Sequence, residues 1–76
     1  MNVTIYTLPD CSACKATKEY LKMNNISYTE KDVSKSKVLA EEMVKISGQM
    51  KVPVMDFEGK IVIGFDQDKI DEILGV

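Results

Sequence analysis

Hydrophobic positions recur with two different periods in the first part of the chain. In residues 2–7, Val3 and Ile5 stand between polar side chains, and this period of two predicts a strand. After Pro9, residues 11–24 carry small or apolar side chains mostly three and four positions apart, which is typical of one helical face. That predicted face contains Ala13, Ala16, Thr17, Tyr20, Leu21 and Met23.

The same succession follows once more. Residues 26–33 alternate in character and predict a second strand, and either Ser34 or Ser36 is suited to cap the helix that follows. This helix is expected to end near Gly48, because glycine is the usual residue at a helix C-terminus. Its predicted apolar face contains Val38, Leu39, Met43, Val44 and Ile46.

The last part of the chain predicts a hairpin and a final helix. Residues 52–57 and 60–64 are apolar runs separated only by Glu58 and Gly59, a gap that suits a two-residue turn between antiparallel strands. Asp66 is then expected to cap the final helix. The buried stripe of that helix would be Ile70, Ile73 and Leu74. The predicted order is β-α-β-α-β-β-α, an α/β fold in one domain spanning residues 1–76.

Composition and charge exclude several classes of function. The chain has 76 residues, of which 45% are hydrophobic, so it can bury a small core. Its net charge is −2, and its ten cationic residues are lysines spread along the sequence, so nucleic acid is not an expected partner. There is no histidine, which excludes a Cys-His pair and a Cys/His zinc site, and no metal site within one chain is expected.

Targeting signals are not evident in the sequence. No basic stretch precedes an apolar segment at the N-terminus, and no apolar run approaches the roughly 18 residues that a membrane span needs. We therefore expect a cytoplasmic monomer that does not associate with membranes.

Both cysteines lie in one motif, Cys11-x-x-Cys14, between the first strand and the first helix. At a helix start, side chains three positions apart share a face and can come within disulfide distance. Cys11 would also face the unpaired amides of the helix N-terminus, which favour the thiolate, so Cys11 is the candidate nucleophile. The alternative is a pair of small buried hydrophobic residues. In a reducing compartment this spacing indicates redox or metal chemistry rather than a structural staple.

The chain resembles the glutaredoxin-like proteins over nearly its whole length. The resemblance is carried by Cys11-x-x-Cys14 after the first strand, Val52-Pro53 at the third, and Gly64-x-Asp66 at the last helix. It includes small bacterial glutaredoxins and the redoxins that reduce ribonucleotide reductase. The resemblance implies a thioredoxin-like fold, with a four-stranded mixed sheet flanked by three helices.

The function implied by the resemblance is that of a thiol-disulfide oxidoreductase. Cys11 would attack a disulfide of a protein or a glutathione mixed disulfide, and Cys14 would then release the reduced substrate. No bound cofactor is implied, and glutathione or a thioredoxin reductase would be the external reductant. One alternative is a redoxin that donates electrons to ribonucleotide reductase and is recharged by thioredoxin reductase. Others are a metal or iron-sulfur carrier whose ligands come from two chains, and a passive binding module.

The resemblance also implies a substrate site. The Val52–Pro53 bond is expected to be cis and to lie opposite Cys11, where the Val52 backbone would pair with an extended substrate; alternatively, Pro53 simply begins an edge strand. Gly64, Phe65 and Asp66 occupy the glutathione-binding position, although Asp66 also suits a plain helix cap. Phe65 replaces the second glycine of a Gly-Gly pair, so we expect modest use of glutathione.

Overall fold

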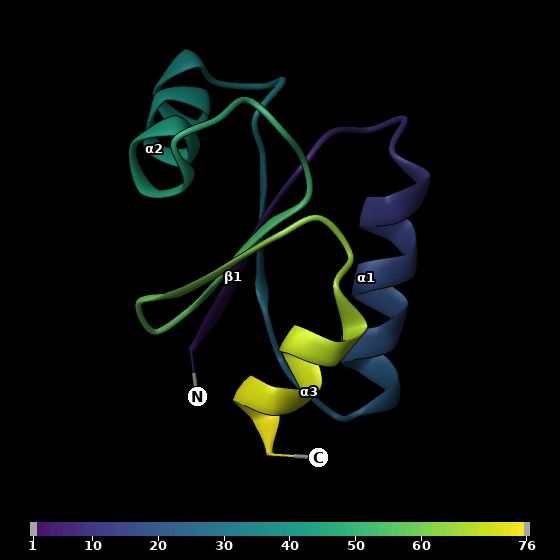
Figure 1. Cartoon of the computed structure of the whole chain (residues 1–76). Coiled ribbons are helices and arrows are strands. Elements are labelled where there is room, and N and C mark those ends of the chain that lie inside the picture. Colours follow the sequence, from purple (N-terminus) through teal and green to yellow (C-terminus); the bar gives the residue numbers. More distant parts are fainter. Residues whose placement is uncertain (1, 76) are drawn as a thin grey trace.

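A computed structural model describes residues 2–75 and shows a sheet with helices on both faces (Figure 1). The elements follow the predicted order β-α-β-α-β-β-α. Their bounds are β1 Val3–Thr7, α1 Ser12–Met23, β2 Thr29–Asp32, α2 Lys37–Ser47, β3 Val54–Phe57, β4 Lys60–Ile63 and α3 Gln67–Leu74.

The four strands form one mixed sheet in the order β2-β1-β3-β4. β1 and β2 run parallel, as expected for two strands joined by a helix, whereas the β1–β3 and β3–β4 pairs are antiparallel. The β3–β4 hairpin turns at Glu58 and Gly59, with φ of 53° and 100°. The Asp56 carboxylate accepts a hydrogen bond from the Gly59 amide at 2.7 Å and so supports a glutamate in this unusual conformation. The predicted two-residue hairpin is confirmed.

Side chains alternate between the two faces of the sheet and build two cores. On the face covered by α1 and α3, the buried residues are Val3, Ile5, Leu21, Met55, Phe57, Val62 and Ile70. On the face covered by α2, they are Tyr6, Val33, Met43 and Val54. Because successive strand residues point to opposite faces, β3 sends Met55 and Phe57 to one core and Val54 to the other.

Three of the helix boundaries are set by the caps that the sequence predicts. Ser36, one of the two candidates, caps α2 through a hydrogen bond from the Leu39 amide at 3.4 Å, and Gly48 ends this helix with a left-handed φ of 79°. Ser34 instead donates its amide and hydroxyl to the Asp32 carboxylate. Asp66 caps α3 by accepting from the Lys69 amide at 3.1 Å.

Three residues assigned to helical apolar faces lie in solvent. Met23 is 80% exposed and Val38 is 71% exposed, so both assignments were wrong. Met23 lies two positions from the fully buried Leu21, and about 100° of rotation per residue turns it to the far side of α1. Ala13, the first member of the predicted α1 face, is exposed as well.

Two predicted strands are shorter than expected. β2 begins at Thr29 rather than at residue 26, because its pairing with β1 starts at Thr4 and Thr29. Ile26 and Tyr28 instead pack against the core beneath α1 and α3. Residues 52 and 53 precede β3, whose pairing with β1 ends at Tyr6 and Val54.

None of the helices within residues 2–75 is long and apolar enough to cross a membrane.

Leu21→Ala and Met23→Ala form a matched test of which α1 residues support the fold. Removing the fully buried Leu21 side chain should cost about 2–5 kcal/mol of unfolding free energy, because it leaves a cavity in the core. Removing the exposed Met23 side chain should change that free energy by less than about 0.5 kcal/mol. Urea denaturation measures both, and equal losses would contradict the arrangement of α1.

Candidate active site

Three loops meet at one end of the sheet and bring the candidate site residues together. β1 runs toward this end and continues into the loop that holds Cys11. β3 is antiparallel to β1 and pairs Val54 with Tyr6, so the preceding Val52 and Pro53 lie at the same end. β4 pairs Ile63 with Val54 and leads there into residues 64–66. The sheet therefore gathers segments that are more than fifty positions apart in the sequence.

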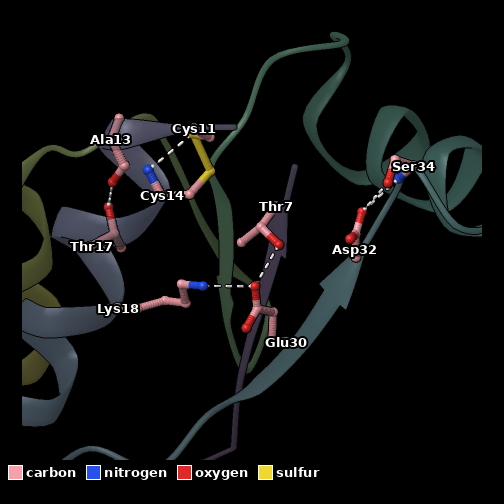
Figure 2. A network of polar contacts seen from close by, with 9 residues as sticks. All are labelled: Thr7, Cys11, Ala13, Cys14, Thr17, Lys18, Glu30, Asp32 and Ser34. Carbon is pink, nitrogen blue, oxygen red and sulfur yellow. Dashed lines mark hydrogen bonds and ion pairs between the residues drawn. A yellow bond between two sulfur atoms is a disulfide. The ribbon is translucent and has the colours of Figure 1, made fainter. Parts of the chain in front are cut away.

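Cys11 and Cys14 are joined by a disulfide at the start of α1 (Figure 2). Their Cα atoms are 5.2 Å apart, within the usual range for disulfides. Cys11 is the N-cap of α1, with extended backbone angles, and its Sγ accepts a hydrogen bond from the Cys14 amide at 3.0 Å. A sulfur atom thus occupies the place where a serine or aspartate oxygen usually caps a helix.

The two sulfur atoms differ in accessibility. Cys14 is only 1% exposed and contributes to the interior, whereas Cys11 is partly exposed at the end of the loop. The exposure of Cys11 is intermediate between buried and exposed. An incoming group can therefore reach Cys11 and is kept from Cys14 by the surrounding protein.

A network of polar side chains fixes the end of β1. No pattern in the sequence predicted it. The buried Thr7 hydroxyl donates to a Glu30 carboxylate oxygen at 2.8 Å, and Lys18 Nζ donates to the same oxygen at 3.0 Å (Figure 2). The hydrogen bond from Lys18, followed by that from Thr7, lowers the pKa of the Glu30 carboxyl. These contacts tie β1, β2 and α1 together, and finding them from the sequence requires the register of the two strands.

The Val52–Pro53 peptide bond is cis, as the resemblance led us to expect. Pro53 is buried, and its carbonyl accepts a hydrogen bond from the Gly64 amide at 2.7 Å. Gly64 has a φ of 78°, which a side chain would disfavour. This bond joins the α2–β3 loop to the β4–α3 loop.

Phe65 lies between α1 and the start of α3. Its side chain is 38% exposed, and its ring meets that of Tyr20 at a centroid distance of 5.7 Å and an interplanar angle of 61°. The Tyr20 hydroxyl donates to a carboxylate oxygen of Asp71 in α3. This hydrogen bond, together with desolvation, raises the pKa of Tyr20. Neither contact could be found from the spacing of residues along the chain.

The structure brings all the predicted site residues to this end of the sheet in two groups. Cys11 and Cys14 are directly bonded, and Pro53 and Gly64 are joined through their backbones. Asp66 serves as the helix cap of α3. Among the side chains of residues 2–75, no group of three or more His, Cys, Asp or Glu is arranged to hold a metal ion.

Known proteins are similar to this chain in sequence and in fold. The family model for glutaredoxin matches residues 3–62. A glutaredoxin-like 8.6 kDa protein in the rubredoxin operon of Clostridium pasteurianum is 40% identical over 72 residues, which cover 95% of this chain and 96% of that protein.

Two solved structures extend the comparison to the fold. The glutaredoxin from Archaeoglobus fulgidus superposes with a TM-score of 0.88 and 31% identity, over 95% of this chain and 84% of that one. The glutaredoxin-like NrdH-redoxin from Escherichia coli gives a TM-score of 0.85 and 29% identity, over 95% and 93% of the two chains. The fold is therefore thioredoxin-like, as predicted. Because the family model covers most of the sequence and the structural match spans nearly all of it, the chain belongs to the glutaredoxin family, with Cys11–Cys14 as its redox-active disulfide.

Proposed function

We propose that this glutaredoxin-family protein reduces disulfides of other proteins through Cys11 and is recharged by a protein reductase, such as thioredoxin reductase, more readily than by glutathione. The observation that carries the proposal is the position of the Cys11 sulfur at the amide end of α1, beside a buried partner. Members of the family are generally thiol-disulfide oxidoreductases.

The first step is attack by the Cys11 thiolate on one sulfur of a substrate disulfide. A new bond forms between Cys11 and that sulfur, the substrate disulfide breaks, and the departing thiolate takes a proton from water. The amide that donates to Cys11 Sγ in the disulfide form is available to donate to the thiolate in the reduced form. The partial exposure of Cys11 allows this approach.

In the second step, Cys14 resolves the mixed disulfide. Its thiol loses a proton, its sulfur attacks Cys11, and the second substrate sulfur leaves as a thiolate, so the pair of electrons passes from the protein dithiol to the substrate. The Cα separation of 5.2 Å suits this bond without movement of the helix. Burial of Cys14 favours attack on its neighbour over attack on a second external disulfide.

The substrate would lie along the backbone before β3. Residues 52 and 53 are outside the paired register of β3, at the end of the sheet where Cys11 lies. We propose that the Val52 backbone pairs with an extended segment of the substrate, which places a substrate disulfide against Cys11. Such pairing recognises the backbone of the substrate more than its side chains, so it suits a range of protein disulfides.

Three features oppose glutathione as the preferred reductant. Phe65 places a side chain where relatives that use glutathione carry a glycine, and the Asp66 carboxylate already accepts from the Lys69 amide at the start of α3. Asp66 and α3 together also hold four carboxylates and a single lysine. Glutathione carries a net negative charge at neutral pH, so these carboxylates repel it.

A relative supports recharging by a protein. The NrdH-redoxin from Escherichia coli, which matches nearly the whole chain, is described as a glutaredoxin-like protein with a thioredoxin-like activity profile. We propose the same profile for this chain, in a cytoplasm whose reductases keep the dithiol reduced.

Serine variants of the two cysteines should separate the two steps. Cys11→Ser should abolish reduction of a disulfide peptide, because the accessible nucleophile is lost. Cys14→Ser should still attack, yet accumulate a mixed disulfide on Cys11, because the resolving sulfur is absent. Mass spectrometry after exposure to the peptide measures both, and adducts carried mainly by Cys14 in the wild-type protein would reverse the assignment.

Phe65→Gly should improve recharging by glutathione. Opening the start of α3 is expected to raise kcat/KM for glutathione by about tenfold, equivalent to ~1.4 kcal/mol of recovered binding. The variant should lose about 1–2 kcal/mol of stability with its aromatic contact and its backbone restriction. Initial rates of reduction by glutathione, and by thioredoxin reductase with NADPH, measure the preference.

Leu8→Gly is the matched control, since Leu8 is 40% exposed and also lies in a loop at the Cys11 end of the sheet. It should leave the rate with glutathione unchanged. Efficient turnover of the wild-type protein with glutathione, with no gain in Phe65→Gly after correction for the folded fraction, would return the protein to the glutathione-dependent class.

A further inference from the structure

We infer that Tyr20 and Asp71 are positioning residues that hold the Phe65 ring over the start of α3, and that they thereby set the preference against glutathione. The inference rests on the proposed function, in which Phe65 shields this position. It assigns part of that specificity to two residues on α1 and α3 that lie outside the loops of the active site.

The side chain of Phe65 has a defined support. Its ring and the Tyr20 ring meet edge to face, a geometry in which aromatic pairs attract beyond their buried area. Tyr20 is itself partly buried against the core beneath α1 and α3, so it offers Phe65 a fixed surface. A ring that is 38% exposed and had no such support would be free to rotate away.

Asp71 fixes Tyr20 in turn. It accepts the hydrogen bond of the Tyr20 hydroxyl, although the two residues are 51 positions apart in sequence. The hydroxyl is protonated, and can donate, throughout the neutral range because the ordinary pKa of tyrosine is about 10, and the hydrogen bond to Asp71 raises the pKa of Tyr20 further. The contact links the last turn of α1 to the middle of α3 and so joins the two helices that flank Phe65.

The backbone on both sides of Phe65 is also held in place. The Gly64 amide donates to the Pro53 carbonyl at 2.7 Å, and Asp66 caps α3. With both neighbours of Phe65 fixed, its remaining freedom is mainly that of its side-chain torsions, and these are what the Tyr20 ring restricts.

The test is a set of variants made in the wild-type and Phe65→Gly backgrounds. Tyr20→Leu removes the aromatic support, Asp71→Ala removes the acceptor, and Asp71→Asn retains an acceptor oxygen. Tyr28→Leu is the matched control, because Tyr28 is also a partly buried tyrosine on the same core but precedes β2 at the opposite end of the sheet. The readouts are KM and kcat with glutathione, and the nuclear Overhauser effect between the rings at positions 20 and 65.

In the wild-type background, Tyr20→Leu and Asp71→Ala should lower KM for glutathione by about two- to tenfold, the range that loss of one such contact represents. Tyr28→Leu should leave KM unchanged, and Asp71→Asn, which removes the same repelling charge as Asp71→Ala but keeps an acceptor oxygen, should lower KM by less than Asp71→Ala does. In the Phe65→Gly background, Tyr20→Leu should not lower KM further, and Asp71→Ala and Asp71→Asn should lower it equally, by the loss of one repelling charge alone, because the positioning residues act through the ring that has been removed. Asp71→Ala should also weaken the nuclear Overhauser effect between the rings at positions 20 and 65, whereas Asp71→Asn should preserve it.

Three results would overturn the inference. An unchanged KM in Tyr20→Leu and Asp71→Ala, beside a lower KM in Phe65→Gly, would show that the loop alone positions Phe65. Equal decreases in both backgrounds would show that Tyr20 and Asp71 act independently of the ring. If Phe65→Gly itself does not lower KM, the shielding in the proposed function is refuted; an inter-ring effect that survives in Asp71→Ala refutes the positioning separately.

Discussion

The structure depends on a hydrogen bond from the Cys14 amide to the Cys11 sulfur at the first turn of α1. It makes one cysteine both the cap of α1 and one half of the redox-active disulfide, so the start of the helix and the position of the disulfide are specified by the same atoms. The sheet determines the position of this helix start. β1 ends at Thr7, whose hydroxyl donates to the Glu30 carboxylate, and Lys18 donates to the same carboxylate. The disulfide therefore sits on a rigid junction of strand, loop and helix.

The Cys11–Cys14 pair is formed by local structure, whereas the position of the loop before β3 depends on the pairing of distant strands. Cys11 and Cys14 need only one helical turn to meet, whereas Val52 and Pro53 reach the same place because β3 pairs antiparallel with β1. We propose that specificity toward the reductant depends on contacts of still longer range, between Phe65 and Tyr20 and between Tyr20 and Asp71. Substitutions in α1 and α3 can therefore alter the choice of reductant while leaving the reactive pair in place.

The features that could be predicted from the sequence are those that depend on residues close together along the chain. The order of elements, the Glu58-Gly59 turn, the Asp66 cap and the Cys11–Cys14 pair all follow from local spacing, and the structure shows each of them. Met23 was misplaced because hydrophobic character alone does not say where a helical face ends. The Tyr20–Phe65 and Thr7–Glu30 contacts were not predicted, since they join residues that only the folded sheet brings together.

The most direct test of the account is the pH dependence of alkylation of Cys11 in reduced Cys14→Ser protein, where a single thiol reacts. The helix amides should stabilise the thiolate, so the rate should reach half its maximum at a pH clearly below the value of about 8.5 for a free cysteine. The same chain unfolded in urea supplies the reference, and it should titrate like a free cysteine. Coincident midpoints for the folded and unfolded chains would show that the start of α1 does not activate Cys11, and would contradict the account.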